Sequence, residues 1–295
     1  MNKIEFYKTR NLGERFSAAE QFIRQNWKAL CKIILIPAIP LVLVMGYFER
    51  QFSLSMNNLT VNAAEYQDLS EFFYDFGSIF SIYVLIISLF IIVIYALSAT
   101  VMTCYEENYQ NIETNLKKLS HKIFSNMKKI FLVNLAVGLL FVTVFAIFIT
   151  LIAFAPSILK VFGIIILVLG IFAIFPTISL VFYPAIFQGT SIWLSVIKGI
   201  KIGFKNWGTT FVILLIAGIA TSILSALLQS PYLVMQVINP GQTGIVPFIL
   251  ALLSSFAYVI VTPLSFIFLA FHYFSILEKE EGISLKSKIE QFDNL

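Results

Sequence analysis

Long uncharged apolar runs dominate the chain and locate its helices. No charged residue occurs at positions 76–105, 130–159, 161–197 or 206–277. The last run is much longer than the roughly 20 residues that one membrane-spanning helix needs, and turn-forming residues at 229–231 and 239–241 divide it. The runs lack the alternating polarity of barrel strands. The pattern therefore predicts an all-α polytopic membrane protein with six transmembrane helices, at 30–48, 77–104, 130–155, 158–187, 209–228 and 245–277.

A second pattern precedes the first, third and fifth predicted spans. Apolar residues at 12, 16, 19, 23 and 27 recur with identical spacing at 112, 116, 119, 123 and 127, and this spacing forms one face of an α-helix. A third segment begins near residue 193, and the three segments end in Asn26-Trp27, Asn126-Met127 and Asn206-Trp207. We interpret the chain as one membrane domain of three hairpin repeats in a pseudo-threefold arrangement. The repeats cover about 10–104, 110–187 and 190–277, and a short tail follows at 278–295.

In this interpretation, each repeat begins with an amphipathic helix that lies flat on the membrane surface. Basic residues on the three helices would then contact anionic lipid, each contributing about 1 kcal/mol near an acidic surface. The candidate lipid contacts are Arg15, Arg24, Lys28, Lys117, Lys118, Lys122, Lys198, Lys201 and Lys205. We expect membrane phospholipids, and not nucleic acid, to be the partners of these residues, whereas protein partners are left undetermined.

Composition and charge agree with a membrane protein and orient it. Hydrophobic residues make up 59% of the 295 positions and charged residues 12%, about half the charged share of a soluble domain. Of the 20 lysines and arginines, all except Arg50 and Lys160 fall in the N-terminal segment, the loops after spans 2 and 4, or the tail, counting Lys32 just inside the first span with the N-terminal segment. By the positive-inside rule, these parts and both termini are expected in the cytoplasm. The acidic segment 49–76 is expected to be an outer loop.

A resemblance accompanies the third amphipathic segment. Two stretches carry this resemblance. One runs from Ser191 to Trp207 and leads directly into a span, and the other runs from His272 to Gly282 at the end of the last span. In both stretches the chain resembles the membrane domain of bacterial glycerophosphoryl diester phosphodiesterases and uncharacterised multispan relatives. The resemblance implies a bacterial inner-membrane protein. It does not imply the phosphodiesterase reaction, which belongs to a separate soluble domain.

Residues with catalytic chemistry are scarce. The sequence has two histidines, His121 and His272, and no zinc-protease, phosphate-loop or CxxC motif, so we expect no cofactor and no metal site. His272 is expected to have a hydrogen-bond partner, and Cys31 and Cys104 are expected to be unpaired. The polar residues inside the predicted spans are expected to form hydrogen bonds between helices. They are Ser88, Ser98, Asn134, Thr143, Thr150, Thr177, Ser179, Tyr183 and Gln229.

Three functions are compatible with this sequence. The first is a non-enzymatic inner-membrane protein with a lipid- or envelope-associated role. The second is a transporter or channel for a neutral or lipidic solute, with a path lined by the polar residues of the spans and with prolines as hinges. The third is a membrane-embedded enzyme, for which Glu106, Glu107 and His272 are the candidates. The sequence favours the first, because the predicted spans contain almost no ionisable groups.

Overall fold

A computed structural model describes residues 3–61, 69–154, 156–239 and 241–284, and this part of the chain contains helices and connections but no strand. The elements are α1 (Leu12–Leu30), the π-helix η1 (Cys31–Leu35), α2 (Ile36–Val61), α3 (Leu69–Glu107), α4 (Leu116–Ala153), α5 (Ser157–Ile178), α6 (Tyr183–Phe187), α7 (Ile192–Lys205), α8 (Trp207–Ile238) and α9 (Ile245–Glu281). Six helical stretches among these residues are long and apolar enough to cross a membrane. The predicted number of six is therefore confirmed by length and composition.

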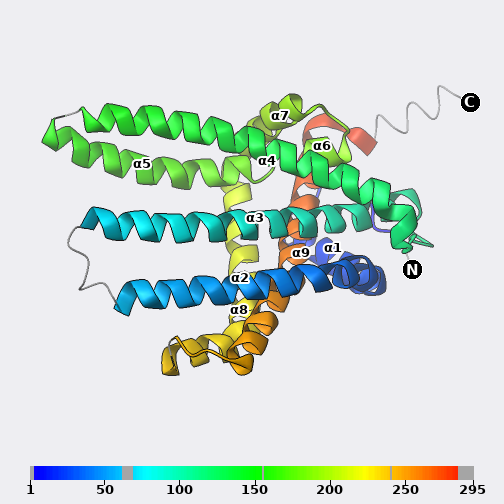
Figure 1. Cartoon of the computed structure of the whole chain (residues 1–295). Coiled ribbons are helices and arrows are strands. Elements are labelled where there is room, and N and C mark those ends of the chain that lie inside the picture. Colours follow the sequence, from blue (N-terminus) through cyan, green and yellow to red (C-terminus); the bar gives the residue numbers. More distant parts are fainter. Residues whose placement is uncertain (1–2, 62–68, 155, 240, 285–295) are drawn as a thin grey trace, which may run out of the picture.

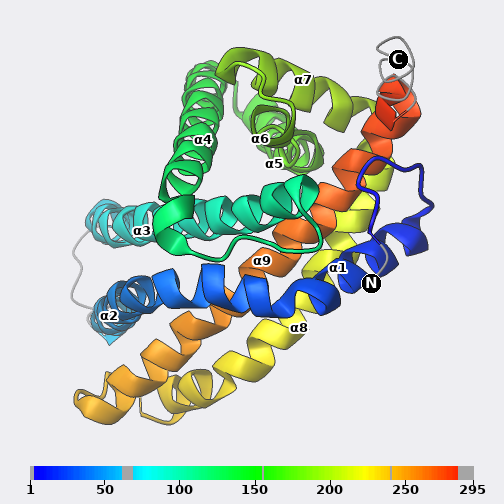
Figure 2. The same cartoon turned by 90° about the vertical axis from the view of Figure 1, so that its right-hand side faces the viewer.

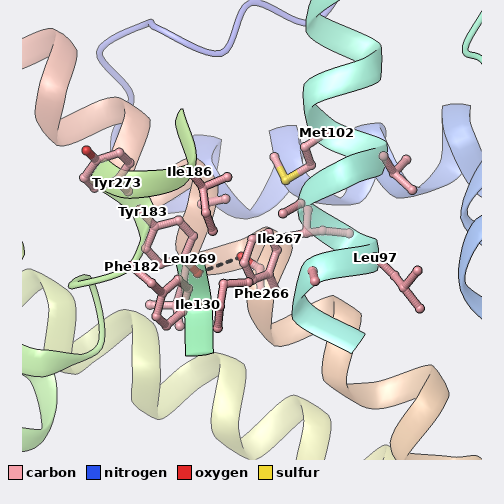
Figure 3. Packing of buried hydrophobic residues seen from close by; sticks show 14 of the residues in the cluster. Leu97, Met102, Ile130, Phe182, Tyr183, Ile186, Phe266, Ile267, Leu269 and Tyr273 are labelled. Carbon is pink, nitrogen blue, oxygen red and sulfur yellow. Dashed lines mark hydrogen bonds between the residues drawn. The ribbon is translucent and has the colours of Figure 1, made fainter. Parts of the chain in front are cut away.

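Helix α9 forms the centre of the molecule. Every residue from Phe266 to Leu277 is buried, except Phe268, which is partly buried. Helices α1, α2, α3 and α8 all pack against α9. The short helix α6 contributes Tyr183, whose hydroxyl donates to the Phe266 carbonyl at 3.0 Å (Figure 3). Phe6, from the charged N-terminal segment, is also buried and its ring lies 4.9 Å from that of Phe274.

The three helix pairs are arranged differently from one another. The pairs α2–α3 and α4–α5 run in the same general direction, whereas α8 and α9 cross them steeply (Figures 1 and 2). The predicted pseudo-threefold arrangement is therefore wrong for this structure. The physical reason is that α9 buries residues on all its sides near its C-terminal end, which places it between the other elements and not at the periphery.

Both ends of the described chain lie at the same end of the molecule. The N-terminal segment, α1, the start of α4 and the last turns of α9 are on the right in Figure 1, and the end of α2, the start of α3, the end of α4 and the start of α5 are on the left. Local signals explain several helix ends. Asn11 and Glu14 form a reciprocal capping box that starts α1, and Gly282 ends α9 in a left-handed conformation with φ 57°.

The described helices extend beyond the predicted spans. The segment from Glu49 was expected to be a loop, but α2 continues to Val61. Similarly, α8 continues through Pro231 to Ile238, so the connection to α9 starts ten residues later than the predicted end of the span at 228. In both places the continuation packs on another helix: Ser53 of α2 donates to Gln236 of α8 at 2.6 Å. Tertiary contacts therefore stabilise helices that the sequence pattern ends early.

The three amphipathic segments also differ in how each connects to the span that follows it. Helix α1 passes into α2 through the π-helix, which ends two residues before Pro37, so no break separates the two. In the second unit, α4 is one continuous helix from Leu116 to Ala153. A break occurs only in the third unit, where Asn206 separates α7 from α8. Of the three described segments, only the third thus forms a helix separated by a break from the span that follows it.

Candidate functional site: a basic end and an apolar groove

Helix α7 has three chemically distinct faces. Its buried face contains Ser195, Val196, Gly199, Ile202 and Gly203. The Ser195 hydroxyl donates to the Val181 carbonyl at 2.6 Å and accepts from the Ala185 backbone N–H at 2.9 Å. A Cβ atom at Gly199 would lie 2.9 Å from the Val181 nitrogen, so the two backbones are in direct contact. Glycine is required for this approach, because any side chain would meet backbone atoms.

The other two faces of α7 are an exposed apolar face and a lysine face that is partly paired with α9. Trp193 and Phe204 are 58% and 74% exposed, and Ile197 between them is also exposed. At 3.6 residues per turn these three residues share one face, and Lys198, Lys201 and Lys205 share the next. The Lys198 ammonium pairs with Glu281 at 2.6 Å. Helix α7 therefore has one face packed on the protein, one exposed apolar face and one basic face.

Helix α1 shows the same three faces. Ala18, Phe22 and Asn26 are buried, Trp27 is 56% exposed, and Arg24 and Lys28 lie on the exposed polar side. The recurrent asparagine is structural here, because the Asn26 amide donates to the Phe22 carbonyl of its own helix at 2.9 Å.

Arg15 of α1 is partly buried and bonded to other parts of the protein. Its guanidinium donates to the Arg10 carbonyl and to Nδ1 of His272, at 3.0 and 2.6 Å. Because Arg15 donates to Nδ1, the His272 proton must be on Nε2, which faces the Thr210 hydroxyl at 3.0 Å. The expected hydrogen bond at His272 is therefore present.

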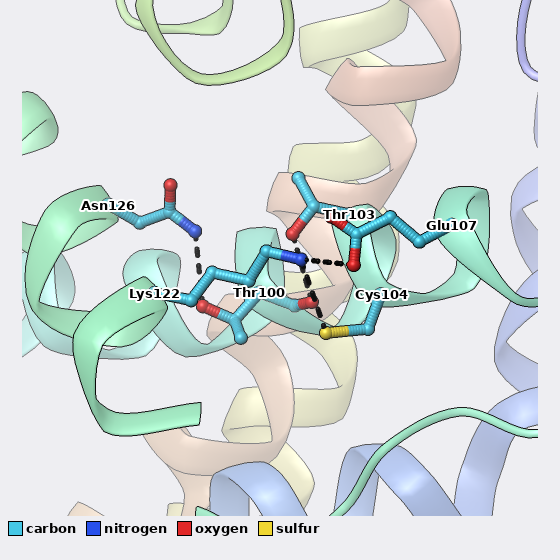
Figure 4. Close-up of polar contacts among 6 residues, drawn as sticks. All are labelled: Thr100, Thr103, Cys104, Glu107, Lys122 and Asn126. Carbon is cyan, nitrogen blue, oxygen red and sulfur yellow. Dashed lines mark hydrogen bonds and ion pairs between the residues drawn. The ribbon is translucent and has the colours of Figure 1, made fainter. Parts of the chain in front are cut away.

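The start of α4 is attached to the end of α3 (Figure 4). Lys122 lies 2.7 Å from a Glu107 carboxylate oxygen and 3.6 Å from the Cys104 sulfur. The Asn126 amide donates to the Thr100 hydroxyl at 3.1 Å, so this asparagine connects two helices. Both cysteines are free, as expected. Glu107 and His272, proposed as members of one catalytic group, thus have different partners.

Glu113 begins the turn before α4. The Asn115 backbone N–H, and then Lys118 at 3.2 Å, hold the pKa of the Glu113 carboxyl below its usual range. His121 is exposed.

The nine candidate lipid contacts fall into two groups. Five have protein partners: Arg15 as above, Lys118 with Glu113, Lys122 with Glu107, Lys198 with Glu281 and Lys205 with Glu280. Arg24, Lys28, Lys117 and Lys201 are exposed and belong to no ion pair among the described residues. These four are the most available for a lipid headgroup.

An apolar groove lies between α4 and α5. It has a volume of about 390 Å³ and ends at Ile200 of α7. Its walls are aliphatic and aromatic except for Thr177, and Gly170 forms part of the α5 wall. No heavy atom lies within 4 Å of the position where a Cβ of Gly170 would be. Its volume is within the range of sites that hold small molecules, and its lining suits a hydrocarbon chain.

Several polar residues of the spans differ from expectation. Ser88, Thr143 and Thr150 are exposed, and each hydroxyl donates to a carbonyl four residues earlier in its own helix. The prediction of hydrogen bonds between helices is therefore wrong for these three residues. Their side chains lie on exposed faces of α3 and α4 and bond instead to their own helix. Tyr183 does connect two helices.

The sequence pattern missed a buried polar cluster on α2, α8 and α9. Glu49 and Arg50, expected in a loop, are 8% and 5% exposed. The Glu49 carboxylate accepts hydrogen bonds from the hydroxyls of Ser254 and Ser255, at 2.6 and 2.7 Å. The adjacent serines on α9 were a signal that could have indicated a polar partner within the spans.

No group of three or more acidic, histidine or cysteine residues in the described part of the chain could hold a metal ion. Asp68, in the acidic segment 49–76, lies outside the described residues.

Together, the six long apolar helices define a multi-pass helical membrane protein. No protein-family model, curated protein or solved structure matches this chain.

Proposed function

We propose that the chain is a non-enzymatic protein of the bacterial cytoplasmic membrane. It binds anionic phospholipid at its basic end, which we define by the exposed residues Arg24, Lys28, Lys117 and Lys201. Both termini would be cytoplasmic, and the role would be lipid- or envelope-associated. The observation that carries the proposal is the division of α7 into a protein face, an exposed apolar face with Trp193 and Phe204, and a lysine face. Such a helix suits the boundary between lipid tails and headgroups, where tryptophan is favoured.

The same division supports three related units. Around the axis of each helix, taken in the same direction, the buried, apolar and basic faces of α1 and of the start of α4 follow one another in the same order as in α7. In α4 the buried side is marked by Leu119, whereas the exposed Phe124 and Lys117, seven residues apart, lie about 20° from one another, so the apolar and basic sides adjoin. Relationship to the membrane domain of glycerophosphoryl diester phosphodiesterases is part of this proposal, because the two stretches that suggest it form α7 and the end of α9.

The groove supports a lipid over a polar solute. It ends at Ile200, and Lys201 follows on the neighbouring face of α7. A phospholipid with one acyl chain in the groove could therefore place its phosphate near Lys201. The alternative, a transporter, would need a polar path, but Ser88, Thr143 and Thr150 of its expected lining are on the outer surface.

Native mass spectrometry of the full-length protein, extracted gently from membranes, tests the headgroup part. We expect phosphatidylglycerol to remain bound in preference to phosphatidylcholine, and K201Q to lower its occupancy. K279Q is the matched control, because Lys279 is also exposed but lies on α9 outside the three basic segments. Equal retention of both lipids by the wild-type protein would contradict the proposal.

A matched pair of glycine substitutions tests the groove. In G170L the new side chain enters the groove, whereas in G138L it extends from α4 outside the lining residues; a Cβ meets no heavy atom within 4 Å at either position. We expect G170L alone to reduce the number of lipids retained. If G138L reduces it equally, the groove is not the site.

A further inference from the structure

Buried hydrogen-bond donors without partners are concentrated where α2 meets α8. Both terminal nitrogens of Arg50, the Tyr232 hydroxyl and the Gln236 amide nitrogen are buried and have no hydrogen-bond partner among the described residues. Arg50 and Tyr232 are each 5% exposed. An unpaired buried cation is much more costly than an unpaired neutral group, so this arrangement needs a physical explanation.

Glu49 does not neutralise Arg50, although the two residues are adjacent in sequence. Neighbouring residues of an α-helix point about 100° apart, and both Glu49 oxygens are taken by Ser254 and Ser255 of α9. The carboxylate thus faces α9, and the guanidinium keeps its donors and its charge.

The remaining groups are held on two facing helix surfaces. Arg50 and Ser53 are three residues apart on α2, and Tyr232 and Gln236 are four residues apart on α8, so each pair shares a face. The Ser53 hydroxyl donates to the Gln236 carbonyl oxygen at 2.6 Å. This bond fixes the amide and leaves its N–H₂ group as a donor. The Tyr232 hydroxyl faces Ser53 and Arg50 but is outside hydrogen-bonding geometry.

We propose that Arg50, Tyr232 and Gln236 form a binding site for an oxyanion, either a phosphate or a carboxylate group. All the orphan atoms can donate a hydrogen bond, and one group carries a positive charge, so the complementary ligand is an anion with several acceptor oxygens. A guanidinium binds such a group through two parallel hydrogen bonds. The ligand would neutralise the buried charge and satisfy the donors in one step.

This site goes beyond the proposed function and is separate from the basic end. Arg50 follows Leu30, the last residue of α1, by 20 positions, which corresponds to about 30 Å along a helix. The oxyanion could belong to a phospholipid headgroup or to a free solute, because both present the same oxygens.

The experiment uses the full-length protein in an uncharged detergent at constant ionic strength. Its thermal unfolding midpoint is measured against inorganic phosphate, acetate and short-chain phosphatidylglycerol, with chloride as reference, since a ligand that binds the native state raises the midpoint. A rise with phosphate or acetate identifies a free anion. Because the basic end is itself proposed to bind the lipid, only the part of a lipid-induced rise that R50Q removes identifies a headgroup at Arg50. No rise with any of the three probes overturns the proposal.

The variants R50Q and K279Q form the comparison. K279Q removes an exposed cation of α9 outside the three basic segments and should keep the ligand-induced rise, whereas R50Q should abolish the rise with phosphate or acetate and lower the rise with lipid. Y232F and Q236L each remove one donor with little change in volume and should weaken binding roughly tenfold, in line with a hydrogen bond to a charged group. They keep the test valid if R50Q does not fold. Binding unchanged in R50Q, or in both Y232F and Q236L, refutes the site.

Discussion

The backbone contact between α7 and the α5–α6 corner makes a quantitative prediction for Gly203. In G203A the new Cβ would lie 2.8 Å from Thr177 Cα, whereas carbon atoms are optimally about 3.5–4.0 Å apart. Helix α7 would have to move by about 1 Å. Overpacking costs about 1–3 kcal/mol, and we expect about 3 kcal/mol here because a backbone atom cannot rotate away. Replacing a helical glycine by alanine stabilises the helix by about 1 kcal/mol, so the net destabilisation of the protein should be about 2 kcal/mol.

The control is G208A at the start of α8, where no heavy atom lies within 4 Å of the new Cβ. G208A should be stabilised by about 1 kcal/mol through helix propensity alone. The free energies of unfolding of the two variants should therefore differ by about 3 kcal/mol, or about 6–12 °C in the unfolding midpoint of a chain of this size. Thermal unfolding of both proteins in detergent, followed by tryptophan fluorescence, measures the difference. Equal midpoints would show that α7 is not packed on Thr177, and the assignment of its other faces to lipid and water would lose its basis.

Two further predictions concern orientation and the buried carboxylate. After replacement of the native cysteines, T60C at the far end of α2 should react with an impermeant thiol reagent on intact cells, and K279C only after lysis; the reverse pattern would invert the topology. The double variant S254A/S255A leaves Glu49 without its two donors and should destabilise the protein by about 1–3 kcal/mol, as measured by unfolding. Adding E49L should restore most of this loss, and additive effects would show that the three side chains do not interact.

The sequence alone determined the helical class and the number of spans. These depend on local properties: an apolar run of sufficient length can satisfy its backbone only as a helix in lipid. The separation of basic from acidic segments is equally local. The hydrogen bond at His272 and the unpaired state of the two cysteines were also predicted correctly, because isolated residues of these types leave few alternatives.

The position of Glu49 and Arg50 could not be read from the sequence. A charged pair after an apolar run is the usual pattern of a helix that leaves the membrane, and the local signal contains nothing against this interpretation. The pair is buried because Ser254 and Ser255, more than 200 residues later, reach the carboxylate. Burial of a charge depends on its partners, and partners distant in sequence are invisible to a periodicity argument.

The arrangement of the spans was likewise decided by tertiary structure. The matched spacing of the amphipathic segments predicted three similar units, yet α4 is continuous, α7 is separate, and α8 and α9 cross the other pairs steeply. Similar helices can pack in different ways, because the contact faces depend on small residues such as Gly199 and Gly203 and on what they meet. The sequence determined which segments are helical and apolar. The tertiary structure decided which faces they bury, and it left the three faces of α7 and the donors around Arg50 as the features most informative about function.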